Sequence, residues 1–137
     1  MEDFQAYDYI GAPWPKEHMF HNTKRWPFVH NKLIESERKY HVGNGGFCMR
    51  TKKLVDYVAS IHTEENSNIP EDVLIGVGYR KMIEENNMTF APFEIARQFS
   101  CETMFVENKY TSPNETFGFH GRETHWAEVA KLNTIQL

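Results

Sequence analysis

Apolar residues between positions 52 and 61 recur with the spacing of one face of an α-helix. The residues on this face are Leu54, Val55, Val58 and Ile61. Thr51 stands directly before the stretch, where a hydroxyl group can accept a hydrogen bond from an unpaired N–H of the first turn. The pattern predicts an amphipathic helix over 52–61 with Thr51 as its cap.

A second helix is predicted to begin just after Pro70. Proline is favoured at the start of a helix, and Glu71 and Asp72 place carboxylates near its positive end. Gly76 and Gly78 fall inside the same helix, and each weakens it by about 1 kcal/mol relative to alanine. We therefore expect a helix that begins firmly and continues with low intrinsic stability.

The other predicted elements are short. Strands are predicted over 7–10, within 42–50 and over 88–90, with a helical turn over 92–99 and a last helix over 126–132. Pro13 and Pro15 predict that no regular structure continues past residue 10. Residues 16–41 show no clean period, which predicts an irregular exposed loop. Strands that alternate with helices indicate the α/β fold class.

Composition narrows the possible settings and partners. The 137 residues suffice for one domain over 1–137, with a formal net charge of -4 and no basic face of the kind that nucleic acids require. The apolar runs are too short to cross a membrane. The acidic start, Met1-Glu2-Asp3, lacks the pattern of a secretory leader, so a cytoplasmic setting is expected.

Four short segments carry residues suited to chemistry, and each also has a purely structural interpretation. Trp14 offers a ring face at the end of a strand, or it plugs the core. Gly43, Gly45 and Gly46 allow a ligand to approach the backbone, or they form a tight turn. The pair at 71–72 supplies a general base, or it only stabilises the helix. His120, between glycines and aromatic residues, binds a metal or simply packs.

Taken together, these segments resemble one family. They occur in the order Tyr-Asp-Tyr-Ile-Gly-Ala-Pro-Trp, Val-Gly-Asn-Gly-Gly-Phe-Cys-Met-Arg, Pro-Glu-Asp-Val, Ala-Pro-Phe-Glu-Ile-Ala-Arg-Gln-Phe-Ser-Cys-Glu and Phe-Gly-Phe-His-Gly, from about residue 7 to about residue 121. In this order they are similar to a family of glycosyltransferase domains related to the GT-A type. The resemblance implies a mixed sheet flanked by helices, and it implies that this chain corresponds to the acceptor-side, C-terminal half.

The resemblance also implies roles for individual residues. Asp72 would take the proton from the acceptor hydroxyl, beside Glu71. The acceptor pocket would be lined by Gly43, Asn44, Gly45, Gly46 and Phe47, and Trp14 would lie against a sugar ring. His120 would hold Mn²⁺ or Mg²⁺ under the donor diphosphate. The implied partners are a nucleotide sugar and a glycan or another hydroxyl acceptor.

The chain departs from this pattern in one respect. GT-A enzymes carry a nucleotide-binding half that ends in an Asp-x-Asp motif, and no such triplet occurs in these 137 residues. We therefore expect the donor-binding half to be missing, either because the chain is cut from a longer protein or because a separate chain or self-association supplies it. The alternative is a degenerate module that binds carbohydrate, or another protein, without catalysing transfer.

Overall fold

The computed structural model describes residues 3–43, 46–101 and 118–119, and in this part of the chain the fold is mixed α/β. Its strands are short and pair two by two. Strand β1 (Tyr9–Gly11) pairs antiparallel with β4 (Cys48–Arg50), and β2 (Pro13–Pro15) pairs antiparallel with β3 (Tyr40–Val42). Strand β5 (Ser100–Cys101) pairs parallel with β6 (Gly118–Phe119). The α/β class is therefore confirmed at this coarse level.

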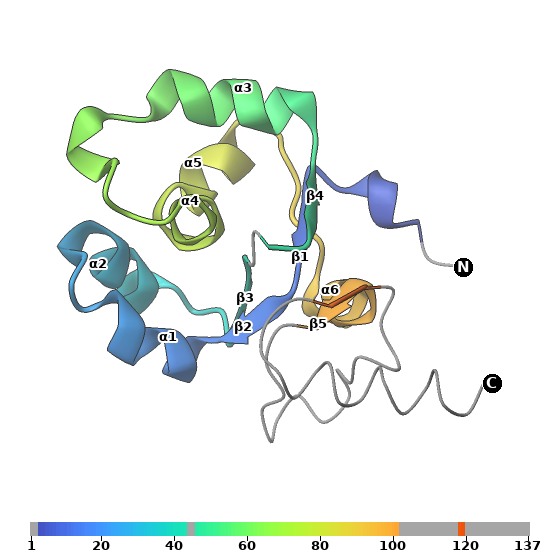
Figure 1. Ribbon diagram of the computed structural model, residues 1–137, viewed down its shortest axis with the longest axis horizontal. Coiled ribbons are helices and arrows are strands. Elements are labelled where there is room, and N and C mark those ends of the chain that lie inside the picture. Colours follow the sequence, from blue (N-terminus) through green and yellow to red (C-terminus); the bar gives the residue numbers. More distant parts are fainter. Residues whose placement is uncertain (1–2, 44–45, 102–117, 120–137) are drawn as a thin grey trace.

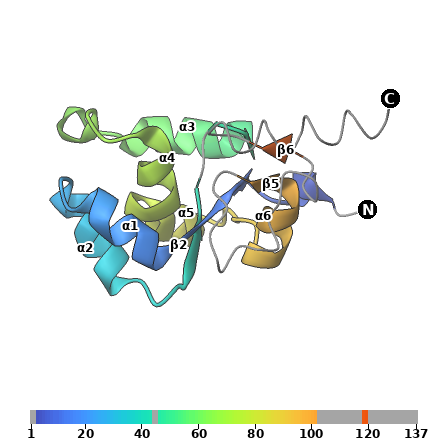
Figure 2. The same cartoon turned by 60° about the horizontal axis from the view of Figure 1, so that its bottom comes forward.

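Helices lie on both sides of these strands. In both views, α1 to α5 lie on one side of β1 to β4, and α6 lies on the other (Figure 1, Figure 2). None of the described helices is long and apolar enough to cross a membrane. The helices are α1 (Lys16–Thr23), α2 (Pro27–Glu35), α3 (Lys52–Ile61), α4 (Glu71–Val73), the π-helix η3 (Leu74–Gly78), α5 (Arg80–Glu85) and α6 (Phe93–Phe99), with 3-10 turns η1 (Phe4–Ala6) and η2 (Glu64–Asn66).

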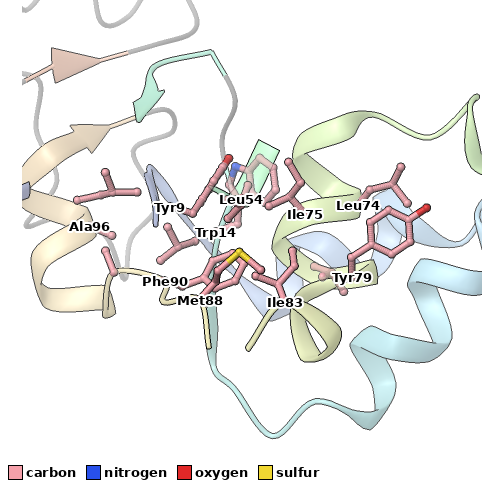
Figure 3. Close-up of a cluster of buried hydrophobic side chains, with 14 of the residues drawn as sticks. Tyr9, Trp14, Leu54, Leu74, Ile75, Tyr79, Ile83, Met88, Phe90 and Ala96 are labelled. Carbon is pink, nitrogen blue, oxygen red and sulfur yellow. The ribbon is translucent and has the colours of Figure 1, made fainter. Parts of the chain in front are cut away.

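The hydrophobic core runs from α6 through the strands to the helices beyond them. Figure 3 shows Ala96 of α6 on one side, Tyr9 and Trp14 of the strands in the middle, and Ile75 and Ile83 on the other side. Tyr9, Ile83 and Ala96 have no exposed surface. Burial of one large apolar side chain contributes roughly 1.5–3 kcal/mol, so this continuous cluster is what holds the short strands in place.

Two helix predictions are confirmed in detail. Helix α3 covers Lys52–Ile61, and Thr51 Oγ1 accepts a hydrogen bond of 3.2 Å from the N–H of Leu54. Of the predicted apolar face, Leu54 is fully buried and Val58 and Ile61 are partly buried, whereas Val55 is 48% exposed, so this part of the prediction was wrong. Helix α4 begins at Glu71, directly after Pro70, with both carboxylates in its first turn. Local capping chemistry was sufficient to predict both helix starts.

The predicted helix after residue 70 is not continuous. It passes from α4 into the π-helix η3, where the N–H of Tyr79 donates to the carbonyl of Leu74 over 2.6 Å, and then into α5. A Cβ on Gly78 would lie 3.1 Å from Cε1 of Phe28 and 3.4 Å from Cγ2 of Val29. The glycines that weaken an isolated helix thus let this one pack closely against α2.

The prediction that the two prolines end regular structure was wrong. Pro13 and Pro15 belong to β2, opposite Val42 and Tyr40. Backbone bonds from Gly43 N to Ala12 O and from Lys16 N to Lys39 O involve the residues directly before and after the strand, at positions 12 and 16. In an antiparallel pair such positions alternate with positions that make no ladder bond, so the prolines occupy places where no N–H is required.

The prediction of an irregular loop over 16–41 was also wrong. Residues in this region form α1, α2 and β3, because a few buried side chains suffice to anchor each helix. Met19 and Thr23 are buried on α1, and Val29 and Leu33 on α2, each pair four residues apart. The predicted strand over 88–90 is reduced to one isolated bridge between Phe90 and Tyr9. The predicted helix over 126–132 lies outside the described residues.

Asp8 ties three distant segments together at the start of β1. Its Oδ1 accepts a hydrogen bond of 2.7 Å from Thr51 Oγ1, and its Oδ2 accepts one of 2.9 Å from the N–H of Thr89. Partial burial acts to raise the pKa of Asp8, but the hydrogen bonds from Thr51 and Thr89 outweigh it and hold the pKa below its ordinary value. The folded protein therefore favours the ionised carboxylate.

We predict that Asp8→Asn lowers the free energy of unfolding by roughly 1–3 kcal/mol at pH 7, because two hydrogen-bond donors lose a charged acceptor. The pKa of Asp8 is lower in the folded state than in the unfolded state. Its contribution is therefore complete above the unfolded pKa and is lost as the pH falls through the folded value. Urea unfolding at pH 7 and near pH 3 should show a smaller difference between the two proteins at the lower pH. An equal difference at both values would contradict this role.

Candidate active site

The candidate site is built around the buried side chain of Tyr9. This residue lies on β1 with no exposed surface, and its hydroxyl donates a hydrogen bond of 2.7 Å to the carbonyl oxygen of Gly43. Burial raises the pKa of Tyr9, and the negative charges of Asp72 and Glu71 raise it further. The phenol consequently stays protonated and remains a hydrogen-bond donor. Tyr9 thus links the glycine segment to the two carboxylates that the sequence singled out.

Trp14 reaches the same place from β2. A Cβ built on Gly43 would lie 2.5 Å from Cζ3 and 2.8 Å from Cε3 of the Trp14 indole, distances that real Cβ atoms do not show. Gly43 is therefore required by the close approach of this ring. Trp14 is only 9% exposed, so its indole ring packs against the protein. The ring supports the backbone at Gly43.

The π-helix η3 approaches the same backbone from the other direction. A Cβ on Gly76 would lie 3.0 Å from the carbonyl oxygen of Val42 and 3.1 Å from Cα of Gly43. Strand β2, the end of β3 and η3 therefore meet at Gly43. Because π-helical turns occur frequently at functional sites, the placement of η3 here is consistent with such a site.

Glu71 and Asp72, the predicted carboxylates, differ in what they contact. Oε2 of Glu71 lies 2.6 Å from Nη2 of Arg50, in an ion pair. Asp72 is partly buried, and its Oδ1 accepts a hydrogen bond of 2.8 Å from the N–H of Val73. Arg50 thus holds Glu71, and the backbone at the start of the helix orients one oxygen of Asp72.

Arg50 is a site residue that sequence reasoning missed. It lies on β4 directly opposite Tyr9, and its guanidinium carbon is 5.5 Å from the centroid of the Tyr9 ring. Burial disfavours its charge, but the hydrogen bond to Glu71 raises the pKa of Arg50 overall, so the ion pair persists. Its Nε is buried without a hydrogen-bond partner among the described residues. Pairing of the predicted strand 7–10 with the end of the predicted strand within 42–50 was the one sequence pattern that could have revealed Arg50 as a site residue.

The remaining predicted residues fall in several places. Gly46 is exposed, and Phe47 is partly buried with its ring 5.2 Å from that of Phe99 on α6. Asn44, Gly45 and His120 lie outside the described residues. The described structure therefore brings Trp14 and Tyr9 to Gly43, and it links Glu71 to Tyr9 through Arg50. Asp72 follows Glu71 in the first turn of α4. It does not address the position of the predicted metal ligand.

Across 3–43, 46–101 and 118–119, no cluster of three or more histidine, cysteine, aspartate or glutamate side chains could hold a metal ion. The described part of the site offers hydrogen bonds, one guanidinium and carboxylates. Such a set can accept a proton and orient a hydroxyl group.

Comparison with known proteins places the chain in a family. Residues 1–120 match the family model described as "Protein of unknown function (DUF5672)". The chain belongs to this family. The match spans every candidate site residue from Trp14 to His120. Searches of curated proteins and of solved structures each give no match.

We predict that Tyr9→Phe lowers the free energy of unfolding by roughly 1–3 kcal/mol, since the buried carbonyl of Gly43 loses its donor and gains no water. Tyr40 is partly buried on β3, so Tyr40→Phe serves as the matched control and should change stability much less. Urea denaturation of both variants measures the difference. Equal effects of the two substitutions would show that the Tyr9 hydroxyl has no special role.

Proposed function

We propose that this chain is the acceptor-side part of a glycosyltransferase, which transfers a sugar from a nucleotide-sugar donor to a hydroxyl acceptor. The observation that carries the proposal is that Tyr9 contacts the glycine segment at Gly43 and lies against Arg50, which pairs with Glu71. An acceptor site needs a backbone that a ligand can approach and a base beside it. The order of motifs that resembles GT-A domains supports the same interpretation.

In the proposed reaction, Asp72 acts as the general base. The acceptor oxygen forms a bond with the anomeric carbon of the donor sugar while its proton passes to the Asp72 carboxylate. The bond from that carbon to the diphosphate breaks, and the nucleoside diphosphate leaves with the electron pair. Asp72 is suited to this role because its carboxylate is oriented by the N–H of Val73 at the start of α4.

Other residues have supporting roles in this proposal. Arg50 holds Glu71, the neighbour of the base, in place. Trp14 and Gly76 fix the backbone at Gly43 from two directions. The donor half, with a GT-A-like extension of the sheet, is supplied by a longer protein of which these residues are part, by another chain or by a second copy. The resemblance further assigns Mn²⁺ or Mg²⁺ to His120, and an imidazole ligand is better suited to Mn²⁺ than to Mg²⁺.

One observation favours the second candidate, a module that binds carbohydrate or another protein without transfer. Trp14 is 9% exposed and Tyr9 is fully buried, whereas a ring that stacks on a sugar needs an accessible face. The two candidates differ in what Asp72 does. In the enzyme it takes a proton, and in the module it contributes nothing beyond binding and helix stability.

We predict that Asp72→Asn slows sugar transfer by about 10²–10⁴-fold, the usual contribution of a general base, without unfolding the protein. The assay measures release of nucleoside diphosphate from a panel of UDP- and GDP-sugars with mono- and oligosaccharide acceptors. Asp56→Asn, an exposed carboxylate on α3, is the control for charge and should leave the rate unchanged. Glu71→Gln should have a smaller effect than Asp72→Asn.

Three outcomes separate the candidates. An unchanged rate in Asp72→Asn removes this residue from the mechanism. Saturable binding of a saccharide with no release of nucleoside diphosphate, in the chain alone and with its partner protein, assigns the non-catalytic module instead. Neither binding nor release across the panel rejects both candidates.

A further inference from the structure

A separate cavity of about 670 Å³ lies between α2, the segment that follows it, and α5, and Val77 of η3 also lines it. This volume is within the range of small-molecule sites. Its back wall contains His41, which is 2% exposed, and Arg80, which is 8% exposed. A buried arginine in the wall of a cavity is unusual, because burial of a charge is costly unless it is compensated.

The charges around this cavity are not fully compensated. Arg80 Nε donates to Oε1 of Glu84 at 3.2 Å, and Arg38 Nη2 lies 3.1 Å and 3.0 Å from the two oxygens of the same carboxylate. Two guanidinium groups therefore share one carboxylate. Burial, and the nearby charge of Arg38, lower the pKa of Arg80 to about 10, so Arg80 remains charged at pH 7.

The remaining lining residues do not remove this excess of positive charge. Lys32 on α2 pairs with Glu35 at 3.8 Å, and Lys81 and Glu37 also line the cavity. The lining thus carries four cationic side chains, the two arginines included, and three carboxylates, in a protein whose formal net charge is -4. A local excess of positive charge in an acidic protein attracts anions to this one place.

His41 fixes the wall without adding charge to it. Burial, and then the nearby charge of Arg80, lower the pKa of His41 to about 4, so the ring is neutral at pH 7. Its Nδ1 lies 3.4 Å from the carbonyl oxygen of Gly76, which can only accept, so Nδ1 carries the proton. Nε2 then accepts from the Ser36 hydroxyl at 3.4 Å. Because the imidazolium form is disfavoured, this serine–histidine pair is suited to shape a binding wall and not to act as a base.

We infer that this cavity binds a phosphate group of a small molecule, held by Arg38 and Arg80 with Lys32 and Lys81 at its rim. Both oxygens of Glu84 accept from Nη2 of Arg38, so a carboxylate already occupies this nitrogen. The cations that remain come from α2, from the segment after it and from α5. A dianionic, tetrahedral group with several acceptor oxygens can meet donors from these separate directions. The inference is independent of the proposed sugar transfer.

The test is titration of the full chain with inorganic phosphate at pH 7 and low ionic strength. Calorimetry measures the binding, and thermal unfolding measures the change in melting temperature. We expect saturable binding and a concentration-dependent rise in melting temperature. The double variant Arg38→Gln/Lys81→Gln should weaken binding by at least about tenfold, since each charge-assisted hydrogen bond accounts for that order of affinity. Lys24→Gln/Lys52→Gln makes the same change in net charge at exposed positions away from the cavity and should leave the affinity within about twofold, because exposed charges contribute little.

A variant that is expected to strengthen phosphate binding tests the inference even if the double variant Arg38→Gln/Lys81→Gln fails to fold. Glu84→Gln removes the carboxylate that competes for both arginines, so it should tighten phosphate binding. Absence of saturable binding by the natural protein overturns the inference. Equal weakening in both double variants, or weaker binding in Glu84→Gln, also overturns it. Preferential binding of succinate over phosphate overturns the choice of phosphate.

Discussion

The close approach of the Trp14 ring to the backbone at Gly43 is the constraint on which the arrangement depends. The indole leaves no room for a side chain at this position, and η3 comes within contact of the same Cα through Gly76. Three elements from distant parts of the chain can therefore meet only because both residues are glycines. This junction places the carbonyl of Gly43 where the Tyr9 hydroxyl reaches it. The position of β1, and of Arg50 opposite Tyr9, follows from that contact.

The junction also separates the two places where ligands are proposed. On one side lies the neighbourhood of Tyr9, with Arg50 and the carboxylates of α4. On the other side, the carbonyl of Gly76 accepts from His41 in the wall of the positively charged cavity. The same π-helical turn thus forms part of the boundary of both. Its closely packed glycines make it a rigid support, because a side chain at Gly76 would collide with backbone and not with a flexible group.

The sequence was informative where local chemistry decides the structure, and uninformative where distant contacts decide it. Thr51 and Pro70 determine helix starts through their immediate neighbours, and both starts were predicted. Strand β2 was missed because whether prolines are tolerated depends on which positions form ladder bonds with β3. Helix α2 was missed although Pro27 stands at its start and two buried residues follow four apart, a pattern that its polar neighbours obscured. Within the site, the glycines and carboxylates were predicted from their types, whereas Arg50 becomes apparent only once β4 is paired with β1.

The most direct test of this account is a double-mutant cycle between Trp14 and Gly43. The φ angle at Gly43 is not in the left-handed region, so only the space above its Cα opposes a side chain there. In the natural background, Gly43→Ala should lower the free energy of unfolding by roughly 1–3 kcal/mol, the usual effect of overpacking. In a Trp14→Leu background, which removes the colliding ring atoms, the same substitution should cost much less. Strictly additive effects would contradict the claim that the contact between this ring and this glycine organises the structure.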